Sequence, residues 1–232
     1  MSITVLDREL YDVPLAAGVL RMSPSTLHWW LEGGKRHGRF YDPVIRPEPT
    51  GNKAVTWGEL VEARYLLGYR RDLLVSLASL RRFIADVREA LNVPYPLAHE
   101  RPWVGEGRRL LVSAQRSSEL PEELWAMWVA ESGQILLTPP GESFLERVEF
   151  DDDQAVRIRP VGKESSIVID PQVRFGMASV HGIPTEALAG QVRAGDPIEM
   201  VAEDFELPLD DVIAALNYEK VSTAPGTTSE AA

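Results

Sequence analysis

One short segment combines side chains that could bind DNA. Beyond residue 22, hydroxyl and aromatic side chains share the face of a predicted helix that lies opposite Leu27 and Leu31. Hydroxyl groups near a helix N-terminus can bond to phosphates and to base edges, and such a helix can enter the major groove. The alternative is a short surface helix without a partner. The candidate DNA contacts of this helix are Ser23, Ser25, Thr26, His28 and Trp29.

A basic stretch follows that helix. Three arginine and lysine side chains and a histidine lie within five residues, and a further arginine follows them. Closely spaced cations suit phosphate contacts by a wing, because they neutralise neighbouring backbone charges. A solvated loop is the alternative. The candidate phosphate contacts are Lys35, Arg36, Arg39 and Arg46.

The remaining sequence holds no arrangement typical of an active site or a metal site. There is no cysteine, and the four histidines lack metal-ligand spacing. The acidic run Asp151-Asp152-Asp153 suits a solvated turn better than a cation site. Gly105-Glu106-Gly107 lacks the third glycine of a dinucleotide-binding loop. We therefore predict no enzymatic activity, no metal and no cofactor.

Charge is distributed unevenly along the 232 residues, whose net charge is −11. Residues 1–60 are neutral, residues 61–120 carry +3 and residues 121–232 carry −14. Because DNA binding depends on local phosphate neutralisation, the first half can bind DNA and the second half cannot. No apolar stretch approaches the roughly 20 residues of a membrane helix. The start does not resemble a signal peptide, so we expect a cytoplasmic protein with no membrane partner.

The N-terminal elements have the size and order of a winged helix-turn-helix. Two short amphipathic helices are predicted, with Asp12 and Ser23 as their N-caps. Candidate strands at 41–45 and 54–56 flank a turn rich in proline and glycine and would form the wing. We therefore assign residues 1–70 to a winged helix-turn-helix.

The middle of the chain is predicted to be a connecting helix followed by a small α+β domain. The helix covers residues 71–92, where leucine, isoleucine and valine recur at helical spacing, and the domain covers residues 93–164. In this domain the pattern predicts strands at 110–112, 134–137, 144–150 and 156–158 and a helix at 120–130.

The C-terminal region, residues 165–219, is predicted to be a trihelical unit preceded by strands at 167–169 and 173–175. The fold class is therefore α+β and mainly α. Three short helices have the size of a second helix-turn-helix, but the last two are acidic. Because an acidic surface repels phosphates, we expect this unit to bind protein or to dimerise. Residues 220–232 are predicted to be a disordered tail.

Two segments resemble known families. The segment from Tyr11 to Leu31, with Ser23-Pro24-Ser25-Thr26-Leu27 before two tryptophans, resembles MerR-like helix-turn-helix domains. The later Thr56-Trp57-Gly58-Glu59 helix start also fits that family. The segment from Ile169-Asp170-Pro171 to Asn217-Tyr218 is similar to a short antitoxin domain family that is often described only as a domain of unknown function. Its members resemble the VapB-type antitoxins that pair with PIN-type ribonuclease toxins.

The resemblance implies an antitoxin of a type II toxin–antitoxin pair, which neutralises a PIN-type toxin and binds operator DNA to repress its own operon. A homodimer would match a palindromic operator. Gly182 stands where that family usually has an arginine, and the tail after Tyr218 has only Lys220 as a base. Inhibition of an acidic nuclease site would then use the arginine-rich region 70–116. The candidate toxin contacts are Arg71, Arg81, Arg82 and Arg88.

Two other functions stay open. A stand-alone MerR-like transcriptional regulator would bind a small ligand in a pocket within residues 93–164 and would have no toxin partner. An enzyme acting on nucleic acid would use acidic residues such as Asp151 to Asp153 with a metal ion, but the sequence offers no convincing set of ligands for it.

Overall fold

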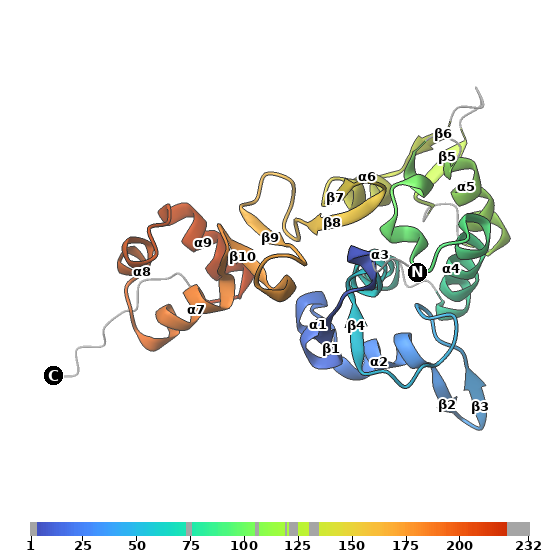
Figure 1. Ribbon diagram of the computed structural model, residues 1–232, viewed down its shortest axis with the longest axis horizontal. Coiled ribbons are helices and arrows are strands. Elements are labelled where there is room, and N and C mark those ends of the chain that lie inside the picture. Colours follow the sequence, from blue (N-terminus) through green and yellow to red (C-terminus); the bar gives the residue numbers. More distant parts are fainter. Residues whose placement is uncertain are drawn as a thin grey trace. The chain divides into compact units, whose positions relative to one another are not determined.

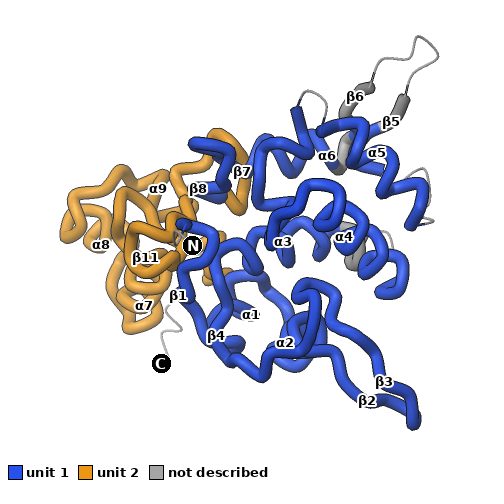
Figure 2. The backbone as a smooth tube through the Cα atoms, turned by 45° about the vertical axis from the view of Figure 1, so that its right-hand side comes forward, with its two compact units in different colours: residues 1–158 blue, residues 159–232 orange. Residues whose placement is uncertain are grey.

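The protein, seen in a computed structural model, consists of two compact units, residues 1–158 and 159–232 (Figure 2). The architecture is α+β and mainly helical, which confirms the predicted fold class. Most of the predicted C-terminal tail lies outside the described residues. The structure describes residues 4–72, 76–104, 107–118, 120, 125–129 and 135–221.

The first unit begins with the two predicted short helices. After the 3-10 turn η1 (Val5–Asp7) and strand β1 (Glu9–Asp12) come α1 (Val13–Leu20) and α2 (Pro24–Glu32). Both predicted caps form: the Leu15 amide donates to Asp12 Oδ1 at 2.8 Å, and the Thr26 amide donates to Ser23 Oγ at 3.2 Å.

The wing differs from the predicted hairpin. It consists of β2 (Gly34–Arg36) and β3 (Arg39–Tyr41), an antiparallel pair that projects from the unit in Figure 1. Strand β4 (Ala54–Thr56) instead pairs with β1. The prediction of a 41–45 strand paired with 54–56 was wrong, because the two-residue turn at His37-Gly38 closes a hairpin earlier in the chain. Both turn residues have positive φ, as the tightest hairpin turns require.

Helix α3 (Trp57–Asp72) joins the N-terminal elements to the middle of the chain. Its capping box forms as predicted, since the Thr56 amide donates to Glu59 Oε2 at 2.9 Å and the Glu59 amide to Thr56 Oγ1 at 3.2 Å. The buried indole of Trp57 donates to the Ala155 carbonyl at 2.6 Å. The middle region is therefore part of the first compact unit and not the separate domain over 93–164 that we predicted.

Two helices follow α3. The first lies within the connecting helix predicted at 71–92, and the second was not predicted from the sequence pattern. Helix α4 (Leu77–Leu91) leads through 3-10 turns η2 (Pro96–Ala98) and η3 (Arg101–Trp103) to α5 (Gly107–Ser117). The predicted strand at 110–112 was wrong. A short apolar run does not distinguish a strand from a helix, and the buried Leu111, Val112, Ala114 and Gln115 share one face of α5.

Strands β5 (Met127–Val129) and β6 (Ile135–Leu137) form an antiparallel pair. Strand β6 confirms a predicted strand, whereas β5 replaces part of the helix predicted at 120–130. The buried Gln115 amide explains this, because it accepts from the Ala126 amide at 2.7 Å and donates to the Met127 carbonyl at 3.0 Å, which holds the chain extended.

The first unit ends with a helix and a hairpin. Helix α6 (Pro139–Leu145) precedes β7 (Val148–Asp151) and β8 (Gln154–Ile158), which pair antiparallel. The strand predicted at 144–150 is therefore helical at its start. The acidic run forms the turn of this hairpin, with positive φ at Asp152 and Asp153.

The second unit contains the three predicted helices and the strand predicted at 167–169, but not the strand predicted at 173–175. Strands β9 (Ile167–Ile169), β10 (Ala178–Val180) and β11 (Ile183–Pro184) are antiparallel neighbours. Residues 173–175 form no strand, because the 3-10 turn η5 (Arg174–Gly176) reverses the chain there. The helices are α7 (Thr185–Ala194), α8 (Ile198–Asp204) and α9 (Leu209–Tyr218). Among the described residues no helix combines the length and apolarity needed to cross a membrane.

Candidate nucleic-acid interface

The exposed face of α2 carries the predicted polar residues. Ser25, Thr26 and His28 are exposed, whereas Leu27, Trp30 and Leu31 are buried against the unit. The hydroxyls of Ser23 and Thr26 lie 2.7 Å apart at the start of the helix. Ser23 therefore serves the helix as its cap, and the side chains that follow it are presented to solvent.

The wing presents three of the four predicted cations. Lys35, Arg36 and Arg39 are exposed on its two strands. Sequence reasoning missed Phe40, which lies opposite Lys35 and is 56% exposed. Its signal was an aromatic residue within a basic run, a combination common in nucleic-acid contacts.

Arg46 is not part of this exposed surface. It is only 6% exposed, and its guanidinium pairs with Glu32 and, at 2.6 Å, with Glu59. It also donates to the carbonyls of Asn52 and Ala54 at 2.9 and 2.7 Å. Burial alone would lower the pKa of Arg46, but the hydrogen bond and charge of Glu59, with those of Glu32, raise it. The prediction that Arg46 contacts DNA was therefore wrong, because its donors are used inside the protein.

Glu32 connects the end of α2 to the loop that follows the wing. Its carboxylate accepts from the amides of Thr50 and Gly51 at 2.9 and 2.8 Å, in addition to Arg46. Burial raises the pKa of this carboxyl, but the amide of Gly51, the hydroxyl of Thr50 and the charge of Arg46 outweigh that effect and lower it. Glu32 therefore remains ionised and holds the loop against the helix.

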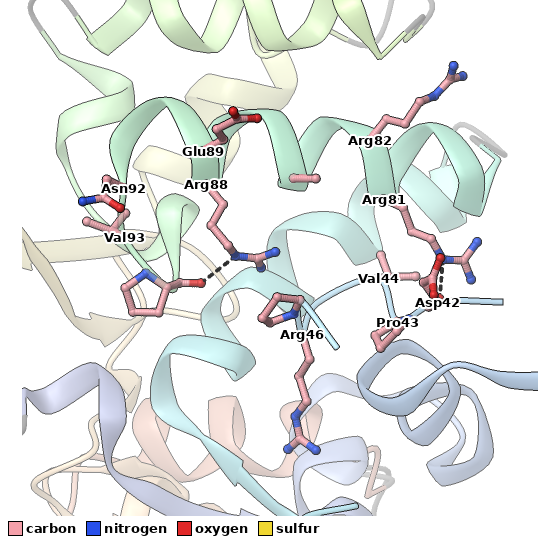
Figure 3. Close-up of a pocket in the computed structure, with 13 residues that line it drawn as sticks. Asp42, Pro43, Val44, Arg46, Arg81, Arg82, Arg88, Glu89, Asn92 and Val93 are labelled. Carbon is pink, nitrogen blue, oxygen red and sulfur yellow. Dashed lines mark hydrogen bonds between the residues drawn. The ribbon is translucent and has the colours of Figure 1, made fainter. Parts of the chain in front are cut away.

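The arginines of α4 hold the segment between the wing and β4. Arg81 Nε donates to the Asp42 carbonyl at 2.5 Å. Arg88 donates to the carbonyls of Ile45 and, at 3.0 Å, Pro94. Both arginines therefore bond within the unit, and a toxin contact by them stays a prediction. Arg82 is exposed and points away from that segment in Figure 3, and the side chain of Arg71 lies outside the described residues.

A stack of side chains connects α4 to α2 through the base of the wing. The Arg81 guanidinium lies 5.9 Å from the centre of the Tyr41 ring, and the Tyr41 ring centre lies 5.9 Å from that of Trp29. The amides of Val44 and Ile45 both donate to the Trp30 carbonyl, at 2.8 and 3.0 Å. The base of the wing and the segment that follows it are thus attached to α2.

A groove of about 710 Å³ lies between α4 and the segment 42–47 (Figure 3). Its apolar lining includes Pro43, Val44 and Val93, and arginines from α4 contribute to its rim. The residues that hold the wing therefore also line a cavity in the same unit.

Glu62 is a fully buried carboxyl beneath Arg88. Its Oε1 accepts from the Leu97 amide at 3.2 Å, and its Oε2 lies 3.7 Å from Arg88 Nη2. Burial raises the pKa of Glu62 to about 8. The charge of Arg88 and the hydrogen bond from the Leu97 amide lower this pKa, but they offset only part of the effect of burial. The group therefore takes up a proton when the protein folds near neutral pH.

The chain is similar to proteins of Mycobacterium tuberculosis. It is 31% identical over 233 residues to "Uncharacterized protein Rv2308" of Mycobacterium tuberculosis, covering 95% of this chain and 94% of the relative. The chain belongs to the Rv2308 family. The crystal structure of Rv2018 from the same organism shares 26% identity with a TM-score of 0.69, covering 92% of this chain and 100% of that one. Residues 167–218 match the family described as "Protein of unknown function (DUF433)". This match confirms that the C-terminal segment belongs to a domain family of unknown function.

The first prediction concerns the buried Arg46 cluster. Arg46→Ala should lower the free energy of unfolding by about 3 kcal/mol at pH 7, because two buried carboxylates lose their counter-charge. Urea unfolding followed by tryptophan fluorescence measures this. Arg39→Ala, at an exposed wing position, should change the free energy by less than about 0.5 kcal/mol. Equal effects of the two substitutions would contradict a structural role for Arg46.

The second prediction concerns Glu62 and pH. Because the folded carboxyl has a pKa near 8 and its ordinary value is 4.5, the folded state binds more protons between these values and the protein loses stability as pH rises. Glu62→Gln removes that loss. Its stability relative to the parent should rise between pH 5 and pH 8, by at most about 1.4 kcal/mol per pH unit. Glu89→Gln, at an exposed position of α4, is the control, and parallel profiles for Glu62→Gln and the parent would refute the assignment.

Proposed function

We propose that this protein binds operator DNA through α2 and the β2–β3 wing and represses transcription. The observation that carries the proposal is the exposed hydroxyl and imidazole face of α2 beside three exposed wing cations, Lys35, Arg36 and Arg39, in one compact unit. The exposed side chains near the start of α2 contact base edges in the major groove, and the wing cations bind the adjacent phosphates.

The fixed position of the wing supports this function. The contacts of Tyr41 with Arg81 and Trp29, together with the Arg46 cluster, attach the wing and the loop after it to α2. Binding then loses less conformational entropy than it would with a mobile wing. Cations held at fixed spacing also keep register with the phosphates.

The second unit is unsuited to DNA. Residues 159–232 carry 5 basic and 12 acidic side chains, and the exposed acids include Glu199, Glu203 and Asp210. A surface of this charge repels phosphates. Within the proposal, this unit makes protein contacts, and the protein works as a homodimer on a palindromic operator.

We further propose that the protein is the antitoxin of a PIN-type ribonuclease toxin in the cytoplasm, and that the repression controls their shared operon. The DUF433 match supports this role, since that family is associated with antitoxin-like proteins. The toxin contact is assigned to α4 and α5, which pack together and are joined by a hydrogen bond from Ser117 to Asp86. The exposed arginines of these two helices include Arg82, Arg109 and Arg116.

A ligand-responsive regulator is the second candidate function. The groove beside the segment 42–47 favours it, because a ligand there would contact the arginines that hold the wing. A further cavity of about 510 Å³ is lined by residues from Leu91 to Leu110 and lies largely within the region predicted to bind a ligand. This function needs no toxin.

The third prediction tests the wing. The triple substitution Lys35→Ala, Arg36→Ala and Arg39→Ala should weaken binding to all DNA sequences alike, because phosphate contacts carry no sequence information. The negative slope of log affinity against log salt concentration should become shallower by about 3, because three phosphate contacts are lost. Salt-titrated fluorescence anisotropy measures both. Lys163→Ala, an exposed cation of the second unit, should leave the slope unchanged, whereas an unaltered slope in the triple variant would remove the wing from the interface.

The fourth prediction tests the antitoxin role. The protein is co-expressed with the product of the neighbouring gene, and rescue of growth and co-purification are measured. Arg82→Glu with Arg109→Glu and Arg116→Glu should weaken capture at least about tenfold, because buried charge pairs at interfaces are costly to break. DNA binding should be unchanged. A parent protein that captures and neutralises no neighbouring product would favour the ligand-responsive regulator.

A further inference from the structure

The turn η5 of the second unit presents an aromatic side chain to solvent. Phe175 is 80% exposed, and no other large apolar side chain of the described residues is shown to be as exposed. Arg174 and Phe175 have consecutive positive φ values of 48° and 54°. Bulky L-residues rarely adopt this left-handed conformation, and such backbone strain is concentrated at functional sites.

The turn is held in place by hydrogen bonds. Arg174 Nε donates to the Gly182 carbonyl at 2.9 Å, and the Gly176 amide donates to the Val173 carbonyl at 3.0 Å. At the entrance to the turn, the Gln172 amide donates to Asp170 Oδ1 at 2.8 Å. Phe175 is therefore exposed by a defined turn. Its backbone conformation is strained, and because its ring is not buried against the second unit, packing of the ring does not compensate for that strain.

The second unit has further exposed apolar side chains for its size. In addition to Phe175, Val161, Met200 and Leu209 are exposed, at 55%, 51% and 41%. Among the residues of the first unit whose burial the structure describes, Leu15, Phe40, Val104 and Leu110 are exposed large apolar side chains. Apolar surface concentrated on a small unit is typical of an interaction site.

Charge divides this surface into two parts. Phe175 follows Arg174, whose guanidinium donates to the Gly182 carbonyl, and the neighbouring His181 ring lies 2.9 Å from Asp211 of α9. Met200 lies one helical turn from the exposed Glu203 and Asp204, on the same face of α8. Arg174 thus supplies the positive charge beside Phe175, and Glu203 and Asp204 supply the negative charge beside Met200.

We propose that the second unit is a dimerisation surface, on which Phe175 of each copy packs against the exposed α8–α9 surface around Met200 and Leu209 of the other copy. A two-fold axis makes both contacts at once, since each copy supplies Phe175 beside a positive charge and Met200 beside negative charges. Arg174 then faces the acids of α8, which gives the pair its charge complementarity.

The same charges argue against two other occupants. DNA would be repelled by the acids of α8 and α9. The arginine-rimmed groove of the first unit would repel Arg174 if Phe175 of a second copy approached it. The inference rests on the proposed function, because a dimer would supply two DNA-binding units to a palindromic operator. The test of the dimer contains no DNA, so the dimer can be refuted while the proposed DNA binding stands.

The test is sedimentation equilibrium of the full chain without DNA. The parent, of 25.8 kDa, should be a dimer of twice that mass. Phe175→Gly should raise the dimer dissociation constant by roughly tenfold or more, as expected for loss of a central aromatic contact. Glycine adopts positive φ without strain, so at concentrations where the parent and the variant are both monomeric the variant should unfold at no lower temperature than the parent.

A charge exchange tests the pairing itself. Arg174→Glu alone and Glu203→Arg alone should each weaken the dimer, whereas a mixture of these two variants should recover part of the affinity as a heterodimer. Phe40→Ala, at an exposed aromatic residue of the wing, is the matched control and should leave the dimer intact. The proposal is overturned if the parent is monomeric at 100-fold the concentration used for DNA binding, or if Phe175→Gly dimerises as the parent does.

Discussion

The buried guanidinium of Arg46 is the interaction on which the arrangement of α2, the loop after the wing and α3 depends. It neutralises Glu32 at the end of α2 and Glu59 at the start of α3, and it bonds to the carbonyls that lead into β4. One cation thereby connects α2, the loop after the wing and α3. Because a buried ion pair stabilises only when both charges are satisfied, these elements form and loosen together.

That cluster continues into a second set of contacts made by α4. Arg81 and Arg88 bond to carbonyls of the segment 42–45, and Arg81 stacks on Tyr41 beside Trp29. The helix that we predicted to be a connector therefore also supports the wing. A ligand or partner that engages α4 would act on the same hydrogen bonds, which links the groove beside α4 to the proposed DNA-binding surface in physical terms.

The two units divide the protein's interactions by charge. Exposed cations lie on the wing and on α4 and α5, whereas the exposed side chains of α8 and α9 include Glu199, Glu203 and Asp210. Two helix-turn-helix-like arrangements in one chain can therefore serve different ligands. The fold alone does not distinguish them, and the charge and strain of particular residues, such as Phe175, carry the functional argument.

The sequence by itself determined the local features of this protein. The caps at Asp12 and Ser23, the capping box at Glu59 and the three C-terminal helices depend on interactions within a few residues, so their patterns predicted them correctly. Only the tertiary structure decided what depends on distant partners. It paired β4 with β1, made residues 110–112 helical and buried Arg46, because the burial of a charge depends on carboxylates 13 and 14 residues away.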